Sequence, residues 1–310
     1  MELIRGLHNL RPRHRGCVTT IGAFDGVHRG HRAVLQRLID KGREMGLPTT
    51  VVVFEPLPKE FFAPLQAPAR LMSFQEKFKA LKELGIDRIL RIRFTETLRE
   101  MDGGEFVRKV FVDGLGAKHI IIGDDLRFGR DRGGNFELLR KFGLKEGFTV
   151  EATETLEVGD ERVSSTRIRK ALEAIDFDLA NTLLGRPFSI SGKVMVGQQL
   201  GRQLGAPTAN LELHRLRSPL SGVFAVDAII DRKTIHGVAN VGTRPTVGDG
   251  LKAILEVHLL DFDCDIYGKN IEVVFRKKIR DEKKFDSIDE LKQQIHHDFE
   301  TGRQYFDSAS

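Results

Sequence analysis

The sequence has few of the features that mark membrane, secreted or zinc-binding proteins. No stretch approaches the roughly 18 apolar residues of a membrane-spanning helix. Residues 1–16 lack the apolar core of a signal peptide. Of the two cysteines, Cys17 and Cys264, neither belongs to a CxxC pair or to a Cys/His pattern with zinc-ligand spacing. We therefore expect a cytoplasmic protein with free thiols, without zinc and without a membrane partner.

The excess of positive charge is also slight. The chain has 49 basic and 44 acidic residues, which gives a formal net charge of +5. Its basic clusters, at residues 11–15 and 276–278, are short, and aromatic residues of the kind that stack on bases are not interleaved with them. This charge is compatible with anionic small molecules such as nucleotides, and we expect no nucleic-acid partner.

The length of 310 residues is comfortable for two domains, each with its own core. In the first half, short apolar or β-branched runs alternate with amphipathic segments, which predicts a parallel, doubly wound α/β sheet. The expected strands are residues 18–23, 50–55, 88–93, 118–123 and 148–152, and the expected helices are residues 31–45, 74–84, 104–115 and 135–142.

The pattern changes after a helical segment that is stopped by Gly185 and Pro187, so we place a boundary between domains 1–186 and 187–310. Beyond it, short strands follow one another without intervening helices, which is typical of a small antiparallel β-barrel. The expected strands are residues 188–196, 223–230, 234–241, 253–260 and 271–276. A terminal helix is expected over 287–299, with Leu291, Ile295 and Phe299 on one face.

Residues 19–38 are predicted to form a strand, a glycine-rich loop and a helix. The loop ends at a helix N-terminus, where unpaired backbone N–H groups and the helix dipole favour an anion such as a phosphate. His28 and His31 add side-chain donors there, and Gly30 keeps the backbone close to a ligand. Taken alone, two histidines at such a turn are as consistent with ordinary surface residues. No Lys-Ser or Lys-Thr pair follows the glycines, so this is not a Walker-type loop.

The longer motif GxFDGxHxGH, complete from Gly22 to His31, resembles the flavin-adenylylating branch of the HxGH nucleotidylyltransferase superfamily. A second motif, VSSTRIRKAL at residues 163–172, resembles the ISSTxxR element of that superfamily and follows in the expected order. By itself, a Ser/Thr group at a helix start is more often a plain cap. The two motifs together are far more specific than either one.

This resemblance implies that the first domain transfers an adenylyl group from ATP to FMN and releases pyrophosphate. Because the attacking FMN phosphate is already an anion, catalysis needs positioning and charge neutralisation rather than a general base. We expect Asp25 to order the loop or to contact the hydration shell of a magnesium ion. The ATP-phosphate and pyrophosphate contacts implied are Gly22, Phe24, Asp25, His28, Gly30, His31, Ser164, Ser165, Thr166 and Arg169.

Two aromatic stretches, FEPLPKEFF and LRFG, are candidates for binding the flat isoalloxazine ring of the flavin. For Phe54 and Phe61, core packing is as consistent as flavin contact. The flavin-adenylylating family customarily has Phe where this chain has Leu126, and Thr where it has Met72. Because of these two differences, the resemblance supports ATP binding more strongly than flavin binding. The flavin contacts favoured by the resemblance are Pro56, Pro58, Phe62, Asp125 and Phe128.

The second domain contains GQQLGRQLGAPTANL at residues 197–211, which resembles the riboflavin kinase signature GxxLGRxLGFPTANL, with Ala206 in place of the usual Phe. The resemblance implies that Thr208 and Asn210 bind the magnesium ion that accompanies ATP, an ion that prefers oxygen ligands. Gly201 and Arg202 are implied as contacts to the ATP phosphates.

Glu256, in the alternating stretch LEVHL, matches the position of the catalytic base in that family. It would take the proton from the riboflavin 5′-hydroxyl as that oxygen attacks the γ-phosphorus of ATP. A glutamate in a strand is by itself more often a solvent-facing residue. Arg280 matches a family position near the flavin or nucleotide, whereas Tyr267, His258 and His236 are expected to be structural.

Together, residues 15–306 resemble the family of prokaryotic bifunctional riboflavin kinases/FMN adenylyltransferases, also called FAD synthetases. The implied fold is an HxGH-type α/β domain followed by a six-stranded antiparallel β-barrel with a terminal helix. The implied function is conversion of riboflavin to FMN in the barrel and of FMN to FAD in the α/β domain, each with Mg-ATP. Because flavins are substrate and product, no prosthetic group is expected. We expect a monomer or weak oligomer.

Three alternatives stay open at this stage. Leu126, Met72 and Ala206 could weaken one of the two modules. A nucleotide- or RNA-binding protein is favoured only by the pI of about 9.2. A third alternative uses the HxGH domain on a different acceptor, as cytidylyl- and pantetheine-type enzymes do, but the kinase-like second domain argues against it.

Overall fold

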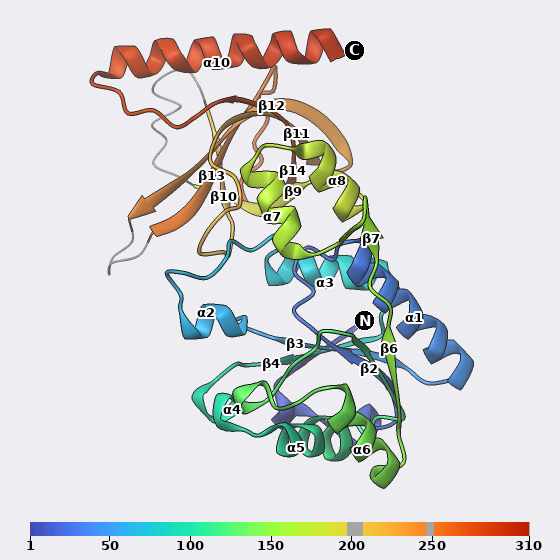
Figure 1. Cartoon of the computed structure of the whole chain (residues 1–310). Coiled ribbons are helices and arrows are strands. Elements are labelled where there is room, and N and C mark those ends of the chain that lie inside the picture. The colour runs from blue at the N-terminus through green and yellow to red at the C-terminus, as the bar shows by residue number, and fades with distance from the viewer. Residues whose placement is uncertain (197–206, 246–250, 310) are drawn as a thin grey trace. The chain divides into compact units, whose positions relative to one another are not determined.

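The computed structural model describes residues 1–196, 207–245 and 251–309 (Figure 1). The contacts between residues divide the chain into two compact units. The first unit is Met1–Pro68 with Phe74–Ser165, and the second is Ala69–Ser73 with Thr166–Ser310. Residues 166–186, which we expected in the first domain, therefore make their contacts within the second unit.

The first unit is built on a six-stranded sheet in the order β1-β4-β3-β2-β5-β6, with every neighbouring pair parallel. This confirms the predicted parallel sheet. The additional strand is the edge strand β1, which four residues form at the very N-terminus. The strands are β1 (Glu2–Arg5), β2 (Val18–Ile21), β3 (Thr49–Phe54), β4 (Arg88–Ile92), β5 (His119–Gly123) and β6 (Thr149–Thr153).

Amphipathic helices connect these strands and bury their apolar faces on the sheet. The helix predicted over 104–115 is α5 continued by a π-helical segment, in which Phe106 and Phe111 are fully buried. The helices are α1 (Arg29–Met45), α2 (Pro58–Phe62), α3 (Phe74–Glu83), α4 (Glu96–Glu100), α5 (Gly103–Phe106), η3 (Val107–Gly114) and α6 (Phe136–Glu146), with short turns η1 (Leu7–Asn9), η2 (Pro12–His14) and η4 (Arg130–Arg132). A small hairpin follows, of β7 (Glu157–Val158) and β8 (Glu161–Arg162).

The order of the strands reverses direction at β2 in this sheet. Strand β2 lies between β3 and β5, so the chain crosses to one side after β2 and later returns on the other. In open parallel sheets, ligands bind at the carboxyl ends of the strands where such a reversal occurs. The loops that follow Ile21, Phe54 and Gly123 all leave from this edge.

The second unit contains a closed barrel of six strands in the order β10-β13-β12-β11-β14-β9, with all neighbours antiparallel. This confirms the expected barrel. The expected strands did not include β10, whose first three residues are the last three of the turn-rich PTANL motif. The strands are β9 (Ser189–Met195), β10 (Ala209–Glu212), β11 (Gly222–Ile230), β12 (Lys233–Pro245), β13 (Leu251–Leu259) and β14 (Asn270–Arg280).

Among the described residues, the helices that accompany the barrel are α7 (Ser165–Glu173), α8 (Phe177–Leu184) and α10 (Ile288–Ala309). The core of the barrel includes Phe224 and Phe275, whose ring centroids lie 5.3 Å apart. Helix α10, red in Figure 1, lies on the outside and contacts β11, β12 and β14. The terminal helix is thus confirmed and is longer than the predicted 287–299.

Candidate active sites

In the first unit, the loop between β2 and α1 has an unusual backbone conformation. Phe24, Gly26 and Val27 have φ values of 47°, 86° and 39°. For residues other than glycine this left-handed region costs on the order of 1–3 kcal/mol each, and it persists where the surroundings impose it. Successive residues in such conformations are typical of loops whose N–H groups converge on an anion.

The two histidines of the motif lie against one another. His28 is the N-cap of α1, and its Nδ1 accepts a hydrogen bond of 3.3 Å from the backbone N–H of His31, so the ring proton is on Nε2. The two rings are stacked, with centroids 3.6 Å apart and planes at 17°. Burial holds the pKa of His31 well below its usual value, and His28, Lys77 and Arg162 lower it further. His31 is therefore a neutral imidazole at pH 7.

The structure brings the two predicted motifs into contact. Ser165 Oγ donates a hydrogen bond of 2.9 Å to the carbonyl oxygen of Asp25, a buried loop residue. Gly30 is enclosed on two sides, because a Cβ there would lie 3.3 Å from His28 Nδ1 and 3.3 Å from the carbonyl oxygen of Val163. Segments about 140 residues apart in sequence are thus joined at the carboxyl edge of the sheet.

Residues 166–172 of the second motif belong to the second unit. The boundary between the units falls between Ser165 and Thr166, inside the motif. Arg169 Nε donates a hydrogen bond of 2.6 Å to the carbonyl oxygen of Ala69, which is also in the second unit.

Lys77 is a buried residue that sequence analysis did not select. It lies on α3 and is only 1% exposed. Its Nζ donates a hydrogen bond of 2.6 Å to the carbonyl oxygen of Ala23, in the loop between β2 and α1. A lysine in an amphipathic helix is usually assigned to the solvent face. Its position four residues before the buried Leu81 places both on one helix face, and this is the signal that sequence analysis could have used.

A second charged group lies at the same edge, after β5. Arg162 Nη2 lies 2.9 Å from Asp125 Oδ1 and 3.2 Å from Asp124 Oδ1. The hydroxyl of Thr155 donates to Asp124 Oδ2 at 2.7 Å, and this hydrogen bond, with Arg162, lowers the pKa of Asp124. The predicted flavin residue Asp125 is therefore paired with a cation that sequence analysis did not select.

The predicted aromatic residues differ in exposure. Phe62, at the end of α2, is 57% exposed and lies 5.6 Å from the ring centroid of Phe94. Phe128 is only 6% exposed and packs on Phe106, with centroids 5.3 Å apart. Pro56 follows Glu55 through a cis peptide bond. Phe62 is thus largely exposed, with the guanidinium of Arg99 over its ring, whereas Phe128 is part of the core, and their contact with flavin stays a prediction.

In the second unit, the strand register aligns the residues predicted for phosphorylation. Glu256 on β13 lies opposite Asn210 on β10 and opposite Asn240 on β12, so the three share one face of the barrel. Their neighbours Leu255 and Val257 are buried, as the alternating pattern predicted, which leaves Glu256 half-buried on the outer face. Asn240 was not selected from the sequence, because only the register shows that it faces Glu256.

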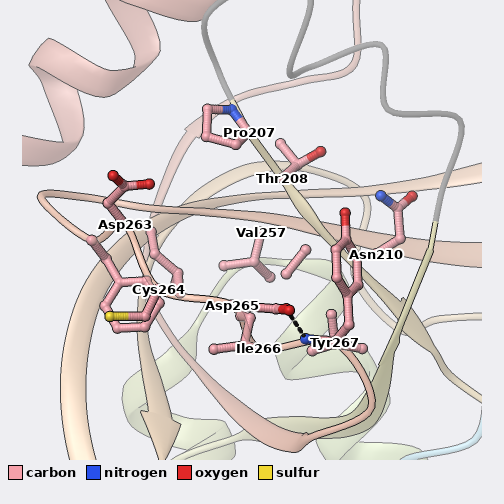
Figure 2. Close-up of a pocket in the computed structure, with 13 residues that line it drawn as sticks. Pro207, Thr208, Asn210, Val257, Asp263, Cys264, Asp265, Ile266 and Tyr267 are labelled. Atoms are coloured by element: carbon pink, nitrogen blue, oxygen red, sulfur yellow. Dashed lines mark hydrogen bonds between the residues drawn. The ribbon is translucent and has the colours of Figure 1, made fainter.

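A pocket of about 370 Å³ is lined by Asn210 of this row and by Thr208, but not by Glu256 or Asn240. Figure 2 shows Thr208 and Asn210 on one side of it, with the loop that carries Asp263, Cys264 and Asp265 on the other. Within this loop, the backbone N–H of Tyr267 donates a hydrogen bond of 2.9 Å to Asp265 Oδ1. Gly201, Arg202 and Ala206 lie outside the described residues.

Arg280 makes an ion pair rather than facing this pocket. Its Nη2 and Nε donate to Asp298 Oδ2 and Oδ1 at 2.7 and 2.9 Å, and Asp298 on α10 is buried. The pair anchors the terminal helix to the end of β14. Contact of Arg280 with a flavin or nucleotide stays a prediction.

Comparison with known proteins identifies the family. Residues 10–167 match the family model for FAD synthetase, and residues 184–306 match the model for riboflavin kinase. A curated bifunctional riboflavin kinase/FMN adenylyltransferase from Pseudomonas fluorescens is 55% identical over 98% of this chain and 97% of its own length. The chain belongs to this bifunctional family.

Further relatives agree in length and architecture. The family member from Escherichia coli K12 is 50% identical over 99% of this chain and 98% of its own. A solved structure from Streptococcus pneumoniae, titled a macrolide-efflux protein, is 32% identical and covers 97% of this chain and 98% of its own, with a TM-score of 0.75. That title is a description of the streptococcal protein alone. In the described parts of our chain, no helix has both the length and the apolar character to cross a membrane.

Proposed function

We propose that the two reactions of the family are divided between the two units of this chain. The first unit transfers an adenylyl group from ATP to FMN, and the barrel phosphorylates riboflavin with ATP. The division rests on one observation: each unit has its own set of residues that we predict to act on ATP phosphates. In the first unit Ser165 is hydrogen-bonded to Asp25, and in the second Asn210 lies opposite Glu256. We also propose a cytoplasmic enzyme, a monomer or weak oligomer.

In adenylyl transfer, the loop from Gly22 to His31 holds the ATP phosphates. His28 donates from Nε2, because its Nδ1 already accepts the N–H of His31. The Nδ1 of His31 is buried without a hydrogen-bond partner among the described residues, and a phosphate oxygen would satisfy it. The FMN phosphate attacks the α-phosphorus of ATP, and pyrophosphate leaves toward Ser164 of the second motif.

The flavin side of this reaction uses the ring of Phe62, which is 57% exposed. Stacking on a flat heteroaromatic ring suits this residue, and the guanidinium of Arg99, which lies over the ring 5.7 Å from its centroid, would share it with the flavin or move aside. Arg162 lies at the same edge of the sheet, where Asp125 and Asp124 compensate its charge.

In riboflavin phosphorylation, Glu256 accepts the proton of the 5′-hydroxyl while that oxygen attacks the γ-phosphorus. The oxygens of Thr208 and Asn210 are the hard donors that Mg²⁺ prefers, and few protein ligands are needed beside phosphate and water. The adjoining pocket of about 370 Å³ lies within the size range of small-molecule sites, roughly 300–1,000 Å³, and we assign it to the nucleotide.

The test follows riboflavin, FMN and FAD by chromatography after incubation with ATP and magnesium. His28→Ala should lower FAD formation at least ~100-fold and leave FMN formation intact. Glu256→Gln should lower FMN formation by about 10²–10⁴-fold, the usual contribution of a general base, while added FMN is still adenylylated. Loss of FMN formation in His28→Ala, or failure of Glu256→Gln to adenylylate added FMN, would contradict the division.

A further inference from the structure

The segment that carries the proposed magnesium ligands begins where the strand ladder ends. Strand β10 pairs with β13 from Ala209, opposite Val257, to Leu211, opposite Leu255. Pro207 has no N–H and so cannot donate to a ladder. Pro207 and Thr208, which both line the pocket, therefore lie beyond the paired residues.

His258 binds this segment from the neighbouring strand. Its Nδ1 lies 2.8 Å from the carbonyl oxygen of Pro207. A carbonyl oxygen only accepts, so Nδ1 carries the proton and donates it. Burial lowers the pKa of His258 below its usual value, and the neutral ring with its proton on Nδ1 is sufficient for this bond. A side chain thus holds a carbonyl at the place where proline interrupts the ladder.

The terminal helix holds the ring that makes this bond. The ring of Phe299 on α10 is stacked on His258, with centroids 3.8 Å apart and planes at 11°. A flat stack restricts the imidazole to one plane, and in that plane Nδ1 points to Pro207. Contacts therefore run without a break from α10, through Phe299 and His258, to the residue before Thr208.

We propose that His258 is a positioning residue of the kinase site, which fixes Thr208 for Mg-ATP through Pro207, and that Phe299 fixes His258. The inference rests on the proposed role of Thr208 and Asn210. It extends the expectation that His258 is only structural, because it predicts an effect on nucleotide binding rather than on folding alone. Helix α10 thereby contributes to the ATP affinity of the kinase.

The decisive variants are His258→Leu and His258→Asn in the full chain. His258→Leu removes the donor and should raise the KM for Mg-ATP in riboflavin phosphorylation by about tenfold, the effect of losing one hydrogen bond, with a smaller change in kcat. His258→Asn keeps an N–H donor near the position of Nδ1 and should restore the KM to within about threefold of the wild type. An unchanged KM in His258→Leu overturns the proposal.

His236→Leu is the matched control. His236 also stacks on α10, against Phe306 with centroids 3.9 Å apart and planes at 16°, but its Nδ1 bonds to Asp227 at 2.7 Å. Losing this stack should lower thermal stability as His258→Leu does while leaving the KM for Mg-ATP unchanged. Equal KM values in the two leucine variants would show a merely structural effect and would overturn the proposal.

Two further measurements complete the test. If His258→Leu unfolds the barrel, Phe299→Leu keeps the donor and should still raise the KM for Mg-ATP about two- to fivefold; no rise overturns the proposal. FMN adenylylation in the same preparations reports the integrity of the first unit. If Thr208→Ala leaves the KM for Mg-ATP unchanged, the assignment of Thr208 as a magnesium ligand fails and the role of His258 fails with it. A raised KM in Thr208→Ala with an unchanged KM in His258→Leu overturns the role of His258 alone.

Discussion

At the scale of single residues, Lys77 is the most demanding feature of the adenylyl-transfer site. Burying an ammonium group is costly unless hydrogen bonds and charge compensate for lost water. Lys77 is retained at 1% exposure and donates to Ala23, in the loop whose next residue, Phe24, is left-handed. Its positive charge also contributes to the low pKa of His31. Lys77 thus stabilises the loop and keeps His31 neutral.

We predict that Lys77→Met lowers FMN adenylylation about tenfold or more, because the loop loses a charged hydrogen bond worth about 1.5–3 kcal/mol. Riboflavin phosphorylation in the same sample should change less than twofold. The matched control is Lys79→Met on the same helix, since the side chain of Lys79 is 65% exposed. Steady-state kinetics of both reactions measure the effect. Equal adenylylation rates in the two variants would refute a role for Lys77.

Residue roles could be predicted only where a local motif carries them. The histidines of the HxGH motif and the PTAN residues are neighbours in sequence, so their spacing suffices. Lys77, Arg162 and Asn240 depend on how distant segments pack or pair. The spacing of Lys77 to the buried Leu81 is a weak local signal, and nothing local marks Arg162 or Asn240. This is why sequence analysis proposed the motif residues and did not select these three.

At the scale of elements, the Arg280–Asp298 pair decides how α10 is attached. The guanidinium binds both carboxylate oxygens, and the carboxylate is buried. Breaking one side of a buried pair leaves an uncompensated charge, which typically costs about 3–5 kcal/mol. Because Phe299 lies on the same helix, a displaced α10 would also release the ring of His258.

Arg280→Met is therefore predicted to destabilise the second unit by about 3 kcal/mol, discounted from the upper values because the Arg280 side chain is 22% exposed. Thermal unfolding followed by circular dichroism measures this. Arg303 lies on the same helix and makes a solvent-exposed ion pair with Asp261. Arg303→Met removes this pair and should lower the free energy of unfolding by less than about 1 kcal/mol. If both variants unfold at the wild-type temperature, the pair does not anchor α10.

The strands of the first unit that sequence analysis predicted are mostly continuous apolar or β-branched runs, such as β2, which is buried throughout although it has only four residues. The edge strand β1 and strand β10 are as short but partly exposed, and they were not predicted. Strand β10 also follows Pro207, which argues locally against a strand. Tertiary pairing with β9 and β13 supplies the hydrogen bonds that local propensity does not.

At the scale of the whole molecule, residues 166–186 pack with the barrel. Phe177 on α8 contacts Phe224, with ring centroids 6.2 Å apart, and Leu183 and Leu184 are buried. The side-chain oxygen of Asn181 accepts the N–H of Phe188 at 2.7 Å. The domain boundary that we expected after residue 186 was placed where the sequence pattern changes, and this boundary stays a prediction.

We predict that a fragment of residues 166–310 unfolds at a temperature roughly 10 °C or more above that of a fragment of residues 187–310. The shorter fragment uncovers Phe224 and loses the buried side chains of Ile168, Leu172, Leu183 and Leu184, each worth about 1.5–3 kcal/mol. Both fragments lack residues 69–73, so the difference isolates α7 and α8. Calorimetry of the two fragments measures it. Equal melting temperatures would show that these helices do not stabilise the barrel.

The placement of Ala69–Ser73 within the second unit bears on how the protein is made. The carbonyl of Ala69 accepts a hydrogen bond from Arg169, and that of Arg70 accepts one from Arg215. A ribosome delivers these acceptors long before their donors emerge. During synthesis, the five residues 69–73 must therefore remain without these partners until the second unit has been made. Circular permutants that open the chain at this loop should assemble in a different order from the natural polypeptide.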